Sequence, residues 1–274
     1  MEEKQVMGII NVTPDSFYAG SRKQSEHEIA ERTNQIIAEG GSIIDVGAFS
    51  TRPGAAEVCE EEELKRMRYG LEIVRREQPD AVLSIDTFRP AVARMAVEEF
   101  GATIINDVSE GGVTGVVDTP MENSGAGIPE IFREVARLKA TYILMSVQPT
   151  LELTVSHFLK KIKMLNDLGH KDIILDPGYG FGKDVIDGNF ALLARQQELK
   201  DTFRLPLLVG VSRKRMIWQL LGGSASDALN GTTAVNMLAL EHGADILRVH
   251  DVKEAVEAVM IYNRMKRQET GNRK

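Results

Sequence analysis

Polar side chains that could bind an anion or a heterocycle stand at the ends of short apolar runs throughout the sequence. Acidic and amide side chains follow the earlier runs, and basic ones follow the last two. In chain order the candidates are Asn11, Asp86, Asn106, Asp176, Lys214, Arg248 and His250. Their repeated placement after apolar runs indicates one site assembled from distant parts of the chain.

These candidates divide into two chemical groups. The carboxylates and amide of Asp86, Asn106 and Asp176, with the cation of Lys214, suit the edge of an aminopyrimidinone ring, because a carboxylate accepts paired N–H donors. The other group, Asn11, Arg248 and His250, suits an anion with Mg²⁺, since arginine offers a planar fork of donors and asparagine a hard oxygen. Together they predict a pyrophosphate-activated heterocyclic substrate, and the residues alone lead no further.

The same residues have ordinary structural interpretations. Asp86, Asn106 and Asp176 could each cap a following helix, because Asp and Asn are favoured there. The basic stretch Ser212–Lys214 could open a helix. The placement of all these residues at the same ends of the apolar runs is better explained by a binding site.

A glycine-rich stretch, GYGFGK, spans Gly178–Lys183. Its G-x-G-x-G spacing differs from the G-x-G-x-x-G of dinucleotide-binding domains, and it lies too late in the chain to open one. We interpret it as backbone that allows the close approach of a flat ligand.

Eight short apolar runs alternate with amphipathic segments, and this alternation predicts the elements that position the site. The runs span residues 6–12, 43–46, 82–85, 103–105, 141–145, 173–175, 206–209 and 246–249. Continuous short runs are typical of strands buried on both faces of a parallel sheet. Glycines at 40, 101 and 243 stand where helix C-caps belong. We predict an α/β fold, a single (β/α)8 TIM barrel over residues 1–274, with an open doubly wound sheet as the alternative.

Two segments fit this scheme less well. The connection Asp107–Pro129 is too long for a plain strand–helix loop, which favours a mobile loop or an insertion. Residues 266–274 are polar, and we expect a frayed tail there.

Composition excludes several classes of function. The formal net charge of −7 argues against a nucleic-acid partner, which usually requires a basic face. We find neither a signal peptide nor an apolar stretch of membrane-spanning length, so we expect a cytoplasmic protein with no membrane partner. Cys59 is the only cysteine, which excludes an internal disulfide and a thiolate metal cluster.

Seven motifs together resemble those of the dihydropteroate synthase family, in order and in spacing. They are NVTPDSF, DVGAFSTRPGA, SIDTFRP, INDVS, ILDPGYGFGK, LLVGVSRK and RVHDVKE, and the match runs from Gly8 to about Ala258. The resemblance implies a (β/α)8 barrel that condenses 6-hydroxymethyl-7,8-dihydropterin pyrophosphate with 4-aminobenzoate, giving 7,8-dihydropteroate and pyrophosphate. It also implies Mg²⁺ as cofactor and a homodimer.

Matching motif positions assign roles by resemblance. The pterin-binding positions are Asp86, Asn106, Met145, Asp176, Gly180, Phe181 and Lys214. The pyrophosphate-binding positions are Asn11, Thr51, Arg52, Arg248 and His250, with Asn11 also holding Mg²⁺. The 4-aminobenzoate positions are Phe17, Thr51, Arg52, Pro53 and Ser212, while Asp45 would support an arginine or a loop near the anion.

The implied reaction loses pyrophosphate first and leaves a cationic pterin methylene for the arylamine to attack. The residues expected to take part are Asp86, Lys214, Arg248 and His250. No side-chain nucleophile is needed, which agrees with a lone cysteine at position 59 beside a run of glutamates.

The chain departs from the family in two places, after the fifth strand and in the long connection from Gly111 to Gly127, which could narrow the rim of the pterin pocket or form a subunit contact. The family usually has Met-His-Met after the fifth strand, where this chain has Met145-Ser146-Val147. We expect little effect on the reaction, because that histidine is not among the residues above. Two alternatives stay open: a pterin-binding methyltransferase of the same superfamily and a catalytically silent barrel acting as a binding subunit.

Overall fold

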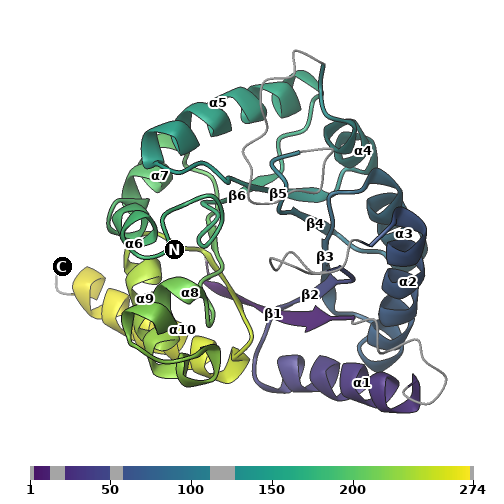
Figure 1. Cartoon of the computed structure of the whole chain (residues 1–274), viewed down its shortest axis with the longest axis horizontal. Coiled ribbons are helices and arrows are strands. Elements are labelled where there is room, and N and C mark those ends of the chain that lie inside the picture. Colours follow the sequence, from purple (N-terminus) through teal and green to yellow (C-terminus); the bar gives the residue numbers. More distant parts are fainter. Residues whose placement is uncertain (1–2, 13–21, 50–57, 112–126, 272–274) are drawn as a thin grey trace.

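Eight parallel strands form the centre of the molecule and helices surround them (Figure 1). The structure is a computed structural model that describes residues 3–12, 22–49, 58–111 and 127–271. The strands are β1 (Gln5–Asn11), β2 (Ile43–Gly47), β3 (Val82–Asp86), β4 (Ile104–Asp107), β5 (Thr141–Met145), β6 (Ile173–Asp176), β7 (Leu208–Val209) and β8 (Ile246–Val249). The helices are α1 (Arg22–Ala38), α2 (Glu60–Glu77), α3 (Pro90–Phe100), α4 (Glu130–Leu138), α5 (Leu151–Asp167), α6 (Asp187–Ala194), α7 (Gln196–Phe203), α8 (Arg215–Leu220), α9 (Leu229–Glu241) and α10 (Val252–Gly271).

The strands close into a barrel, which confirms the predicted fold. Their order in the sheet is β6-β5-β4-β3-β2-β1-β8-β7, and each neighbouring pair is parallel. A single parallel bridge between Leu175 and Leu207 joins the two ends, supported by a 2.9 Å hydrogen bond from the Leu175 N–H to the Pro206 carbonyl. The open doubly wound alternative is therefore wrong.

An apolar layer fills the barrel interior toward the N-terminal ends of the strands. It consists of Met7, Ile43, Ile104, Ile143, Ile174, Leu208 and Ile246, all buried. Side chains alternate along a strand, so residues two positions further on point into the same interior. Five of those seven positions hold Asp45, Asn106, Met145, Asp176 and Arg248, and the other two hold Ile9 and Gly210. The polar residues of the site thus form the neighbouring layer, toward the C-terminal ends of the strands, and they rest on the packed aliphatic side chains.

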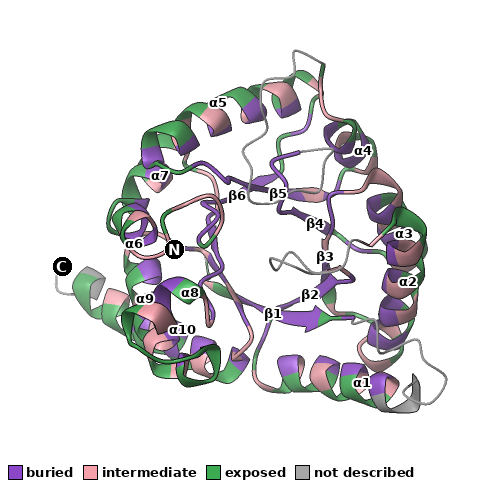
Figure 2. Ribbon diagram, viewed as in Figure 1, coloured by how far each residue is buried: buried purple, intermediate pink, exposed green. Residues whose placement is uncertain are grey.

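A second and larger apolar cluster lies between the strands and the helices, and Figure 2 shows the buried inner sides of the helices against the barrel wall. All three glycines expected at helix C-termini have left-handed conformations, with φ of 90° at Gly40, 64° at Gly101 and 92° at Gly243. These conformations are accessible to glycine at little cost, and they end the helices that precede the next strand.

The C-terminal segment corrects one prediction. Helix α10 continues to Gly271, and the Lys266 amino group bonds Glu241 at 2.7 Å and Glu269 at 3.1 Å. The expectation of a frayed tail from residue 266 is therefore wrong up to Gly271, because these ion pairs support the last turns of the helix. Among the described residues, no helix is both long and apolar enough to cross a membrane.

Candidate active site

Arg248 lies at the centre of the polar layer and binds two carboxylates. Its Nε donates to Asp45 Oδ2 at 2.7 Å, and its Nη2 donates to Asp86 Oδ2 at 2.7 Å. Burial lowers the pKa of Arg248, but Asp45 and Asp86 more than offset this, so its pKa lies above the usual range. Arg248 therefore joins the heterocycle group to the anion group, a contact that the division of the candidates into two groups did not predict.

Asp45 is a fully buried support for this arginine. Its carboxylate also accepts from the Ser84 hydroxyl at 2.6 Å and from the Asn106 amide at 3.3 Å. The predicted support role is confirmed for Arg248. Asp45 was not among the predicted substrate-binding residues, although its position two residues after Ile43 follows the same alternation as Asn106 and Asp176.

Two buried acceptors face the site without a partner among the described residues, namely Asp86 Oδ1 and Asn106 Oδ1. A buried acceptor left unbonded is costly, so such atoms in a native site indicate ligand donors. Burial raises the pKa of Asp86 to about 7, with Arg248 opposing the rise and Asp45 adding to it. Both oxygens can accept N–H donors from a planar heterocycle.

Asp176 and Lys214 add a second pair of charges to the layer. Asp176 Oδ1 accepts from the Gly178 N–H at 2.8 Å, and burial raises the pKa of this carboxyl while Lys214 opposes the rise. Burial lowers the pKa of Lys214 to about 8, partly offset by Asp176. The Lys214 ammonium donates to the Tyr179 carbonyl and lies 4.5 Å from the centroid of the Phe181 ring.

None of the three candidate capping residues caps any helix that the structure describes. Helix α3 has Arg89 as its N-cap, α4 has Pro129 and α6 has Ile186, so Asp86, Asn106 and Asp176 precede these helices by several residues. Lys214 does occupy the N-cap position of α8, but its amino group turns back to the loop after β6.

An apolar wall borders these polar groups. Val108, Met145 and Val147 form a small buried cluster, with Phe49 and Phe181 packed against it. Met145 pairs with Asp176 in the register of β5 and β6, so the wall adjoins the carboxylate. A flat ring bound by the polar atoms would find apolar contact here.

Two glycines of the glycine-rich loop lie against backbone that the sequence did not predict beside them. Gly178 and Gly182 have φ of 72° and 62°, and a Cβ on either would lie 1.8 Å from a backbone carbonyl, that of Ser146 or that of Val147. These two glycines therefore admit the backbone of the neighbouring β5 loop. Gly180 (φ 83°) instead borders the side chain of Lys214, whose Cδ would lie 3.0 Å from a Cβ there.

The rim of the site carries the remaining described candidates. Ser212 Oγ accepts from the His250 backbone N–H at 3.1 Å, and the His250 carbonyl accepts from Arg32. Asn11 is exposed at the end of β1, and a Cβ built on Gly47 would lie 3.6 Å from both its Oδ1 and Asp86 Oδ2. Asn11 and Asp86 thus border the same point. Phe17, Thr51, Arg52 and Pro53 lie outside the described residues.

The described residues hold no group of three or more His, Cys, Asp or Glu side chains arranged to bind a metal ion. Mg²⁺ does not require one, because it keeps several waters and is usually held by one or two protein oxygens and substrate phosphates. An exposed amide oxygen at Asn11 beside the Asp86 carboxylate suits that pattern.

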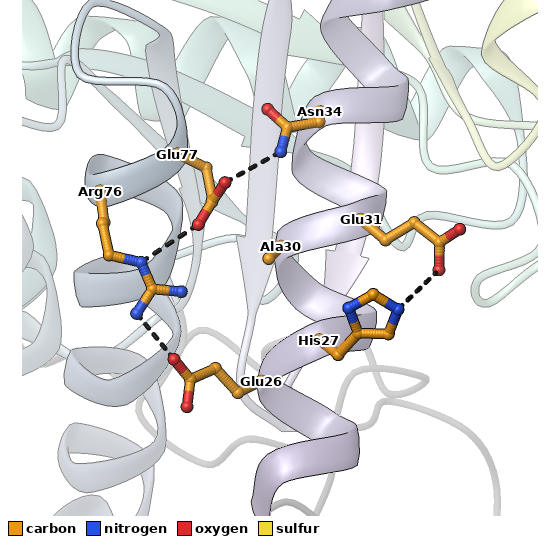
Figure 3. A pocket seen from close by; sticks show the side chains of 7 residues that line it. All are labelled: Glu26, His27, Ala30, Glu31, Asn34, Arg76 and Glu77. Carbon is orange, nitrogen blue, oxygen red and sulfur yellow. Dashed lines mark hydrogen bonds and ion pairs between the residues drawn. The ribbon is translucent and has the colours of Figure 1, made fainter.

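A hollow of about 590 Å³ between α1 and α2 lies away from this layer, on the outer surface (Figure 3). Its charged groups bind one another: Arg76 bonds Glu26 at 2.7 Å and Glu77 at 3.1 Å, and Asn34 bonds Glu77 at 3.0 Å. Its polar groups thus satisfy one another, whereas the barrel site presents unpartnered acceptors.

Comparison with known proteins agrees with the geometry. The sequence profile of the family described as "Pterin binding enzyme" matches residues 7–250. The dihydropteroate synthase of Escherichia coli (strain K12) is 39% identical over 270 residues, which cover 95% of this chain and 91% of that protein. The chain belongs to the dihydropteroate synthase family. It is thus a member of a family of transferases of folate biosynthesis.

Solved structures of the family superpose on this chain. The Xanthomonas albilineans dihydropteroate synthase, solved with 4-aminobenzoic acid, gives a TM-score of 0.83 at 32% identity and covers 96% of this chain and 93% of that one. The Yersinia pestis dihydropteroate synthase, solved with a sulfonamide drug, gives 0.79 at 35% identity, covering 96% and 94%. These relatives are synthases, which favours condensation over methyl transfer.

Proposed function

We propose that this site condenses 6-hydroxymethyl-7,8-dihydropterin pyrophosphate with 4-aminobenzoate to give 7,8-dihydropteroate and pyrophosphate. The observation that carries the proposal is the pair of buried, unpartnered acceptors Asp86 Oδ1 and Asn106 Oδ1 in the barrel interior. An aminopyrimidinone edge supplies N–H donors of the kind these atoms lack. The Xanthomonas albilineans relative was solved with the second substrate in its acid form, 4-aminobenzoic acid.

The pterin would lie between the polar layer and the apolar wall. Asp86, Asn106 and Asp176 would accept from its ring, and Lys214 would donate to it. Met145 and Phe181 would pack against its faces, since both belong to the apolar wall. Gly180 would contribute by making room for Lys214 beside the ring.

The pyrophosphate would lie on the rim beside Asn11, Arg248 and His250, with Thr51 and Arg52 from the loop after β2. Mg²⁺ would bind Asn11 and the phosphates, and when bound it would neutralise charge on the leaving group. Arg248 is held by Asp45 and Asp86, so its guanidinium is already oriented before substrate arrives. Preoriented donors stabilise developing charge without reorganising.

The reaction would begin with cleavage of the C–O bond to pyrophosphate, leaving a pterin methylene cation. Asp86 and Asp176 would stabilise this cation electrostatically, because both are buried and close to its ring. The arylamine nitrogen would then form the C–N bond and lose its proton. No described side chain needs to act as a nucleophile in either step.

The 4-aminobenzoate would bind between Ser212 and the loops that carry Phe17, Thr51, Arg52 and Pro53. Ser212 Oγ accepts from the His250 N–H, so its hydroxyl hydrogen is free to point to a carboxylate. We expect sulfonamides to compete for this place, as the Yersinia pestis complex suggests. Inhibition that excess 4-aminobenzoate leaves unchanged would argue against it.

We further propose that the protein is a cytoplasmic homodimer. Leu238 on α9 and Met260 and Ile261 on α10 are exposed apolar side chains on neighbouring helices. Such residues are typical of a face covered by a second subunit.

Isothermal titration tests the proposed binding mode. The pterin pyrophosphate should bind tightly with Mg²⁺ and more weakly with a chelator, and Asn106→Ala should weaken binding about tenfold or more, since one buried hydrogen bond is lost. Binding that is indifferent to both Mg²⁺ and Asn106→Ala would reject the proposed site.

A further inference from the structure

Glu110 lies just beyond β4 in an unusual backbone conformation. Its φ is 59°, in the left-handed region, and its side chain is buried with a relative exposure of 2%. Left-handed φ is disfavoured for a residue with a Cβ, and a buried carboxylate is costly unless it is bonded. Two unfavourable features at one residue indicate that its contacts fix it in place.

The hydrogen bonds that Glu110 accepts all come from the turn that follows β5, and its Oε2 also lies 3.7 Å from His157 Nδ1 on α5. Its Oε1 accepts from the Val147 N–H at 2.8 Å, from the Ser146 hydroxyl at 3.2 Å and from the Gln148 side-chain amide at 3.2 Å. The Gln148 amide also lies 3.2 Å from Oε2. All three partners are buried. One carboxylate therefore fixes three successive residues of this turn.

A half-buried lysine, Lys183, also holds this turn. Lys183 Nζ donates to the Ser146 carbonyl at 3.2 Å, the Gly178 carbonyl at 3.0 Å and the Phe181 carbonyl at 3.1 Å. The Ser146 N–H also donates to the Asp176 carbonyl at 2.9 Å. The turn is thus tied on one side to the loop after β4 and on the other to the loop that carries Asp176 and Phe181.

The fixed turn also carries the apolar wall of the site. Met145 and Val147 flank Ser146 in sequence, and both belong to the buried cluster against which Phe181 packs. If the turn moved, Met145 would lose its place beside Asp176, its partner in the register of β5 and β6. The position of the wall therefore depends on the Glu110 carboxylate.

We propose that Glu110 is a positioning residue that sets the apolar wall of the pterin pocket through the Ser146–Gln148 turn. This inference rests on the pterin pocket proposed above. The carboxylate acts through Val147 and Ser146, and it does not itself contact the pterin. Its contribution to the 4-aminobenzoate site is correspondingly small.

Glu110→Gly tests this because glycine accepts the left-handed backbone while removing the carboxylate. We expect the Kd for the pterin pyrophosphate to rise about tenfold, because the released turn must be ordered again when the pterin binds. The KM for 4-aminobenzoate should stay within about twofold of wild type, and the melting temperature should fall, because the relief of backbone strain offsets only part of the lost hydrogen bonds. Glu110→Gln, which keeps an acceptor for the Val147 N–H, should restore part of the pterin affinity.

Glu134→Gln is the matched control. Glu134 is also a buried carboxylate, but it lies on α4 and binds Arg94 and Arg137 instead of the site loops. This variant should lower the melting temperature and leave pterin affinity unchanged.

Two results would overturn the inference. One is unchanged pterin affinity in folded Glu110→Gly and Glu110→Gln. The other is an equal loss for both substrates that Gln does not restore, which would indicate general damage. Asp176→Ala distinguishes a wrong role for Glu110 from a wrongly placed pterin pocket. If Asp176→Ala also leaves pterin binding intact, the proposed pocket itself is wrong.

Discussion

Arg248 connects the two halves of the site through two carboxylates. Around it, the carboxylates of Asp45, Asp86 and Asp176 face the cations of Arg248 and Lys214, and Lys183 adds a positive charge near Asp176. The three carboxylates suit a cationic pterin methylene. The group whose charge changes near neutral pH is Asp86, whose pKa is raised to about 7.

Replacement of Asp45 by asparagine tests this arrangement. Asp45 raises the pKa of Asp86, so Asp45→Asn should lower that pKa and move the acid limb of the kcat/KM profile below pH 7. Removing one partner of a buried ion pair should also destabilise the fold by about 3 kcal/mol. The pH–rate profile and urea unfolding measure the two effects. An acid limb that stays in place would show that Asp86 does not control it.

The lowered pKa of Lys214 predicts that kcat/KM falls at alkaline pH. Its pKa is lowered to about 8 by burial, so the charged form is lost as the pH rises through 8 and kcat/KM should fall. Lys214→Arg keeps its charge over this range, and the alkaline limb should disappear even if the maximal rate drops. Persistence of the limb in a folded Arg variant would assign it to another group, for example Lys183, whose pKa is also lowered to about 8.

At the scale of the elements, strand alternation places the site. Five of the seven inward residues of the apolar layer in the barrel are followed two positions later by a site residue, as in Ile43 and Asp45 or Ile174 and Asp176. The sequence predicted the strands and the rim because both follow from this local periodicity. It could not predict the role of Gly178 and Gly182, because the carbonyls they admit come from a loop some thirty residues earlier. Glu110 was missed for the same reason, since only the fold brings it to Val147.

Gly182→Ala measures how closely the β5 and β6 loops must approach. A Cβ there would lie 1.8 Å from the Val147 carbonyl oxygen, so the loops would have to separate. We expect a loss of about 3 kcal/mol or more in the free energy of unfolding, together with weaker pterin binding.

Gly169→Ala is the control, because Gly169 has a similar φ of 79° but no atom within 4 Å of its Cβ position. It should cost only about 1 kcal/mol of backbone strain. Equal losses in the two variants would refute the close-approach interpretation.

At the scale of the whole molecule, the barrel supplies the catalytic face and the outer helices supply a candidate partner face. The order of the motifs along the sequence predicted the catalytic face, and the family resemblance alone predicted the partner face. Residues of the 4-aminobenzoate pocket stay predictions, because Phe17, Thr51, Arg52 and Pro53 lie outside the described ranges.

The proposed dimer predicts a mass near twice 30.3 kDa in solution. Ile261→Glu should shift the protein to the monomer, because Ile261 is exposed on α10 and a charge there would be buried in the interface. Lys163→Glu, an exposed site on α5, serves as the control and should leave the dimer intact. Light scattering after size exclusion measures both, and a monomeric wild type would contradict the dimer.

Pyrophosphate release tests the central claim most directly. Purified protein is incubated with the dihydropterin pyrophosphate, 4-aminobenzoate and Mg²⁺, and pyrophosphate and dihydropteroate are measured together. We predict equal amounts of the two products, and a loss of about 100-fold or more in kcat/KM for Asp176→Ala, because a buried charge beside the pterin cation is removed. Absence of release, or release unaffected by Asp176→Ala, would contradict the proposed function.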